Sequence, residues 1–169
     1  MVFIYRQGIN FRPVRYGGTG SESHLDRQPE VLPDRYEAGP LNGPGIAGLR
    51  AGVSVVLEED VRTIRKKEKK LLEYIFDRME SMDNIIIYGP RDAEKQVGVI
   101  SFSVQKMRAE EVVYALDREC GIMVRAGLHC SPLSHRVMGT VRMSFGYFNG
   151  KQDADDLLDG LKRISHLSR

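Results

Sequence analysis

The chain has 169 residues, 41% of them hydrophobic, and its 25 lysines and arginines against 23 aspartates and glutamates leave a formal net charge of +2. This length is typical of one domain, or of one domain with part of another, and the small mixed charge argues against a nucleic-acid or membrane partner. No apolar run approaches the roughly 18 residues of a transmembrane helix and the first residues do not resemble a signal peptide, so a cytoplasmic location is expected.

The first 48 residues hold five of the seven prolines and predict a loop. Within this stretch, the glycine-rich run from Tyr16 to Ser21 would let backbone N–H groups approach an anion closely, as in a phosphate cradle. A surface turn is the alternative, and both interpretations stay open. Because so long a structureless segment is uncommon inside a compact domain, we expect a domain boundary after residue 48.

Apolar residues at three- and four-residue spacing predict helix from about Pro44 to Met79, as two helices or one bent helix. The six basic residues between Arg62 and Lys70 have acids among and beside them and no aromatic stacking partner, which favours a solvated helix face over a nucleic-acid surface; the acids are Glu58, Glu59, Asp60, Glu68 and Glu73. Two strands, a helix, two strands and a terminal helix are then predicted at residues 84–90, 97–104, 109–117, 121–125, 140–147 and 154–167. Residues 49–169 are therefore expected to form a compact α/β unit.

Cys130 follows a predicted strand and has Arg125, His129 and His135 near it in sequence. Positive charge and imidazoles beside a thiol favour the nucleophilic thiolate, whereas a small buried apolar side chain is the alternative role. The histidines and Cys130 lack the usual zinc spacing, so no metal site is predicted. Cys120 closes the predicted helix and is expected to fill space in the core or at the surface.

Arg142 lies on the strand predicted at residues 140–147. A guanidinium held on a strand suits a bidentate contact with a carboxylate. An ion pair with an acid on the protein surface is the alternative, and the residues alone leave both roles open.

Four segments, in this order, resemble the C-terminal part of class V aminotransferases, in particular cysteine desulfurases and selenocysteine lyases. They are YGGTGS at 16–21, PDRYEAGPLN at 33–42, VRAGLHCSPL at 124–133 and VRMSFGYFN at 141–149. The resemblance implies the α/β small domain of a fold-type I pyridoxal-phosphate enzyme, with an antiparallel sheet flanked by helices. It also implies that residues 1–48 are a remnant of the large, cofactor-binding domain.

The same resemblance implies roles for individual residues. Gly18 and Thr19 would contact the phosphate of pyridoxal 5′-phosphate in a neighbouring subunit, which implies a homodimer. Cys130 would accept sulfur from a cysteine substrate, or selenium from selenocysteine, and with cysteine it would leave a persulfide on the protein and alanine as product. The substrate would be bound by Arg142, at its carboxylate, and by Arg125, His129 and Asn42.

Three features depart from the family's pattern. No lysine in the chain follows a histidine, so the lysine that binds the cofactor is absent and covalent attachment is not expected. The run from Gly39 to Asn42 reads Gly-Pro-Leu-Asn where Gly-Thr-x-Asn is usual, and the loop before Arg142 is short. We therefore expect a portion of a longer enzyme, inactive alone. A cofactor-free thiol or sulfur-transfer module and a small interaction domain are the alternatives.

Overall fold

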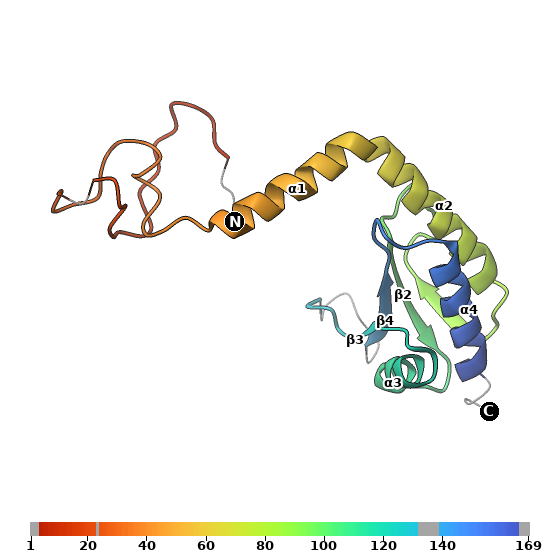
Figure 1. Ribbon diagram of the computed structural model, residues 1–169. Coiled ribbons are helices and arrows are strands. Elements are labelled where there is room, and N and C mark those ends of the chain that lie inside the picture. Colours follow the sequence, from red (N-terminus) through yellow and green to blue (C-terminus); the bar gives the residue numbers. More distant parts are fainter. Residues whose placement is uncertain (1–3, 23, 132–138, 166–169) are drawn as a thin grey trace. The chain divides into compact units, whose positions relative to one another are not determined.

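In a computed structural model, which describes residues 4–22, 24–131 and 139–165, the chain divides into two compact units (Figure 1). They comprise residues 1–55 and residues 56–169. None of the helices in the described residues is long and apolar enough to cross a membrane.

The first unit opens with a long segment that contains no helix or strand among its described residues. The hydroxyl of Tyr36 accepts a hydrogen bond from the N–H of Phe11 at 3.0 Å and donates one to the carbonyl of the same residue at 3.2 Å. The rings of Tyr5 and Phe11 meet edge to face, with their centroids 5.6 Å apart. The loop that the sequence predicts here is confirmed for the described residues up to residue 42.

Two helices follow, α1 (Gly43–Glu59) and α2 (Val61–Met79), which is one of the two arrangements that the sequence predicts. Asp60 separates them because its φ of 64° is not helical, and its carboxylate accepts the N–H of Arg62 at 3.3 Å. No residue of α1 is buried. Helix α2 is amphipathic, and its buried residues are Leu72, Ile75, Phe76 and Met79.

The second unit is built on a four-stranded antiparallel sheet in the order β1-β2-β4-β3. Its strands are β1 (Ile85–Tyr88), β2 (Val99–Val104), β3 (Arg125–Gly127) and β4 (Thr140–Ser144). Along β2, Ile100, Phe102 and Val104 are buried and the residues between them are half-buried, which is typical of a sheet with one covered face. The core lies between that face and the helices α2, α3 (Ala109–Cys120) and α4 (Lys151–Ser165) (Figure 1).

One strand lies further along the chain than the sequence predicts. Helix α3 continues to Cys120 and ends at Gly121, whose φ of 66° is left-handed. The N–H of Ile122 then donates to the carbonyl of Leu116 at 3.0 Å, and Ile122 packs against the core. A strand over residues 121–124 is therefore wrong, because the apolar residues there belong to the end of the helix and β3 begins only at Arg125.

The remaining predicted elements of the second unit are present, with ends that differ by a few residues. Cys120 is partly buried, and its sulfur lies 3.2 Å from where a Cβ on Gly160 of α4 would be. Its expected role as a space-filling side chain is confirmed, since it packs where α3 and α4 approach closely.

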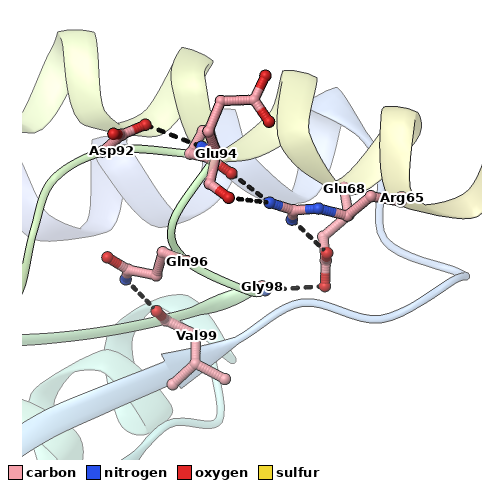
Figure 2. A network of polar contacts seen from close by, with 8 residues as sticks. Arg65, Glu68, Asp92, Glu94, Gln96, Gly98 and Val99 are labelled. Carbon is pink, nitrogen blue, oxygen red and sulfur yellow. Dashed lines mark hydrogen bonds and ion pairs between the residues drawn. The ribbon is translucent and has the colours of Figure 1, made fainter.

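A network of polar contacts joins α2 to the connection between β1 and β2 (Figure 2). The guanidinium of Arg65 contacts the carboxylate of Glu68 at 2.7 Å and also donates to the carbonyl of Ala93. The other carboxylate oxygen of Glu68 accepts the N–H of Gly98 at 2.8 Å. The carbonyl of Gly98 in turn accepts the N–H of Phe145 at 2.7 Å. The network thus fixes the approach to β2 and the residue that follows β4.

We expect the substitution Gly98→Ala to lower the free energy of unfolding by roughly 1–3 kcal/mol. A Cβ at this position would lie 2.7 Å from Oε1 of Glu68 and 2.8 Å from the carbonyl oxygen of Phe145, so the backbone or the helix must shift. Urea unfolding followed by circular dichroism measures the change. Gly52→Ala is the control because its Cβ would meet no atom within 4 Å, and equal losses in the two variants would argue against the clash.

Candidate functional site

Two arginines lie side by side at the β3 edge of the sheet. Arg125 of β3 is directly opposite Arg142 of β4, and opposite residues of an antiparallel pair extend from the same face. Val141 and Met143, which flank Arg142, are buried, so the arginines lie on the face away from the core. Neither forms an ion pair with an acid among the residues that the structure describes. Because like charges oppose each other across a strand pair, the two guanidiniums suit a bound carboxylate.

Cys130 lies in a tight turn immediately after β3. The turn is closed by a hydrogen bond from the N–H of Ser131 to the carbonyl of Leu128, at 2.9 Å. Its two central residues, His129 and Cys130, both have left-handed backbone, with φ of 50° and 62°. Cys130 is exposed, so its alternative role as a buried apolar side chain is wrong.

His129 is half-buried, and its Nε2 lies 3.1 Å from the backbone carbonyl of Thr140. Thr140 is fully buried at the start of β4, and no sequence motif marks it as a site residue. Every residue has a backbone carbonyl, so the identity of Thr140 does not indicate this contact. The preceding Gly139 is the one sequence signal that could have indicated it. His135 lies outside the described residues. Within the described part of the chain, no group of three or more His, Cys, Asp or Glu residues could hold a metal ion.

The glycine-rich loop belongs to the first unit and borders a cavity of about 780 Å³. The carbonyl of Gly18 accepts the N–H of Gly39 at 2.8 Å. The hydroxyl oxygen of Thr19 accepts the N–H of Glu22 and the hydroxyl of Ser21, each at 3.2 Å, which is a local turn stabilised by a side chain. The loop therefore has the geometry of a turn beside a hollow large enough for a phosphate group.

Asn42 caps helix α1, because its side-chain oxygen accepts the N–H of Gly45 at 3.0 Å. A Cβ on Gly45 would lie 2.6 Å from the amide nitrogen of Asn42, so a side chain at position 45 would displace the capping amide. Gly18, Thr19 and Asn42 all belong to the first unit. The other expected site residues are brought together at the β3 edge of the second unit, and they are Arg125, His129, Cys130 and Arg142.

Two lysines of the chain have a pKa shifted in the direction opposite to that of a Schiff-base lysine. The first lysine in the sequence is Lys66, so the first unit, with its glycine-rich loop, has none. Hydrogen bonds to carboxylates raise the pKa of Lys67 (from Glu59) and of Lys151 (from Asp155). A lysine that forms a Schiff base needs the opposite, a lowered pKa and a neutral amine.

Comparison with known proteins gives a consistent result. A family model described as aminotransferase class-V matches residues 2–157. A probable cysteine desulfurase of Staphylococcus epidermidis is 35% identical over 160 residues, which are 91% of this chain and 38% of the relative. A probable cysteine desulfurase of Pyrococcus abyssi is 36% identical over 135 residues, which are 78% of this chain and 33% of the relative.

Solved structures agree with these sequence matches. The apo structure of the cysteine desulfurase from Thermococcus onnurineus NA1 superposes with a TM-score of 0.73 and 31% identity, covering 79% of this chain and 34% of that one. The cysteine desulfurase CsdA from Escherichia coli gives a TM-score of 0.75 and 25% identity, covering 92% and 39%. The chain thus spans little more than a third of the length of the proteins that it resembles.

Proposed function

The chain belongs to the aminotransferase class-V family, and from this premise we propose that it is the sulfur-accepting part of a cysteine desulfurase. One observation carries the proposal. An exposed cysteine, Cys130, lies in a turn directly after the strand whose first residue, Arg125, pairs with Arg142. A nucleophile and a carboxylate-binding pair on neighbouring segments are what sulfur transfer from an amino acid requires.

In the proposed reaction, the carboxylate of a cysteine substrate binds to Arg142, with Arg125 beside it. The thiolate of Cys130 attacks the substrate sulfur, so a sulfur–sulfur bond forms as the carbon–sulfur bond breaks. The substrate carbon keeps the electron pair of the broken bond and takes up one proton, and the products are alanine and a persulfide on Cys130. The exposure of Cys130 supports this role because the persulfide must be reachable by the molecule that receives the sulfur.

Pyridoxal 5′-phosphate is the cofactor that the family implies, and it acts as an electron sink for amino-acid chemistry. The residues present do not make a complete site for it, because the unit with the glycine-rich loop contains no lysine. We propose that Gly18 and Thr19 contact the phosphate of the cofactor, and that the lysine that binds the cofactor covalently lies in a polypeptide segment other than this sequence. We also propose that Asn42 lies beside the substrate in a homodimer. The expected cytoplasmic location stays a prediction.

A cofactor-free thiol or interaction module is not favoured as the function. The family match includes residues 2–157 and is therefore not limited to the α/β unit. It also includes the glycine-rich loop, for which a module that acts through Cys130 alone has no use.

We expect Cys130 to be alkylated at least about tenfold faster than Cys120. Cys130 is exposed in its turn, whereas Cys120 is partly buried against α4. Timed alkylation of the native chain followed by peptide mapping gives both rates in one sample. Cys130→Ser, the matched control, should remove only the fast phase. Equal rates, or faster labelling of Cys120, would count against the sulfur-acceptor role.

Borohydride reduction of the chain with pyridoxal 5′-phosphate is expected to leave no lysine specifically modified. The amines of Lys67 and Lys151 are held by carboxylates, and their pKa values are raised rather than lowered. Mass spectrometry of the digested protein is the measurement. A single lysine carrying the cofactor at full occupancy would refute the expectation, whereas weak labelling spread over several lysines would not.

A further inference from the structure

The turn that carries Cys130 has an unfavourable backbone. Left-handed conformation costs a residue other than glycine roughly 1–2 kcal/mol, and here His129 and Cys130 adopt it in succession. Turns with two such central residues usually contain Asn or Gly, which tolerate this conformation. Neither central residue here is of that kind, and one backbone hydrogen bond, from Ser131 to Leu128, closes the turn. The conformation therefore needs support from outside the turn.

That support is available from the first residue of β4. Nε2 of His129 lies 3.1 Å from the carbonyl oxygen of Thr140. A carbonyl can only accept, so Nε2 carries the hydrogen and donates it. Thr140 is fully buried and is followed by the buried Val141, which pairs with β2 on one side and β3 on the other. The imidazole is thus hydrogen-bonded to β4, which is paired with a strand on each side.

Close approach of two backbones brings the ring within reach of this carbonyl. Gly127, the last residue of β3, is opposite Thr140. A Cβ on Gly139 would lie 3.3 Å from the Cα of Gly127, so the two backbones approach closely where the chain leaves β3 and enters β4. The side chain of His129 therefore spans a short distance, from the turn to the carbonyl at the base of the same loop.

We infer that His129 is a positioning residue: its hydrogen bond to Thr140 holds the strained turn in the conformation that exposes the thiol of Cys130. His129 is half-buried and its imidazole contacts the carbonyl of Thr140 in β4, whereas the neighbouring Cys130 is exposed. The inference rests on the proposed function only in one respect, which is the reason that the thiol of Cys130 must be exposed to its reaction partners. It gives His129 a role different from the contact with substrate that the family resemblance implies.

Two substitutions of His129 distinguish the effect of its hydrogen bond to Thr140 from the effect of how well the residue tolerates left-handed backbone. His129→Asn tolerates the left-handed backbone better than histidine does, but its amide is one bond too short to replace Nε2. His129→Gln places a donor nitrogen the same number of bonds from Cα as Nε2, and it should restore the bond to Thr140. If the hydrogen bond is what holds the turn, the glutamine variant keeps the turn and the asparagine variant loses it.

Amide hydrogen exchange of the intact chain, followed by NMR, tests this. The amide of Ser131, which closes the turn, is expected to exchange about tenfold faster in His129→Asn and within about twofold of the unmodified chain in His129→Gln. Amides of Val141 and Met143 in β4 should stay protected in both variants, which reports that the sheet is intact. Unchanged exchange in His129→Asn would overturn the inference, as would a glutamine variant that exchanges as fast as the asparagine variant or loses the sheet.

The alkylation rates of the two cysteines keep this test separate from the test of function. Equal rates for Cys130 and Cys120 in the unmodified chain would remove the sulfur-acceptor role without touching the anchor. Unchanged exchange of the Ser131 amide in His129→Asn would remove the role of His129 and leave the reactivity of Cys130 as it was measured.

Discussion

Replacing Phe102 with alanine is expected to lower the free energy of unfolding of the second unit by about 3–5 kcal/mol. Phe102 is fully buried on β2, with Ile87 of β1 and Val141 of β4 as its neighbours on either side. The substitution removes the ring from the centre of the core and leaves a cavity that the sheet cannot close without losing its pairing. Since whole domains are stable by only about 5–15 kcal/mol, much of the stability of the unit would be lost.

Phe148→Ala is the matched control for this experiment. The side chain of Phe148 is 94% exposed, so the same change of residue should leave the unfolding free energy within about 0.5 kcal/mol of its original value. Denaturant unfolding of both variants under identical conditions gives the comparison. If Phe102→Ala were as stable as the control, the core assigned to the covered face of the sheet would be wrong.

Limited trypsin digestion is expected to cut the chain first between Arg12 and Arg35, leaving a resistant C-terminal product. The described residues of this stretch form no helix or strand, and nearly all of them are exposed or half-buried. Such a segment buries too little apolar surface to offset the roughly 1–2 kcal/mol that ordering each residue costs. Most of the described arginines of the second unit, in contrast, lie on helices and strands around a core, and the exceptions are Arg91 and Arg108.

Mass spectrometry of samples taken over time identifies the order of cleavage. Early products should all contain intact residues 85–131. First cuts within the sheet, with the first 48 residues intact, would contradict both the division of the chain and the expected mobility of its first part.

Local patterns in the sequence predict most of the fold. Three- and four-residue apolar spacing predicts α2, and alternation predicts β2, because each records which side of the element is buried. The error at residues 121–124 has a local cause as well. Gly121 and Ile122 look like the start of a strand, although in the structure they end α3, and residue identity alone does not distinguish these two uses.

The arrangement of the candidate site is harder to predict from the sequence than the fold is. The motifs around Cys130 and Arg142 indicate that both residues matter, but the opposition of Arg125 and Arg142 depends on strand order, which joins parts of the chain distant in sequence. The anchor on Thr140 uses a backbone carbonyl, a group that every residue has. The left-handed turn was equally unpredictable because His-Cys is not a typical turn sequence.

The crowding around Gly98 also restricts how this sequence can evolve. A side chain at position 98 would meet both the carboxylate of Glu68 and the backbone oxygen of Phe145. Shortening Glu68 removes only the first obstacle, because a backbone oxygen cannot be changed by mutation. Glu68 can therefore be replaced while Gly98 is retained. A side chain at position 98 would still meet the backbone oxygen of Phe145 after that replacement. Among related proteins that keep this sheet, we expect glycine at position 98 to be retained more often than glutamate at position 68. A relative without the glycine is expected to have a different backbone where β4 ends.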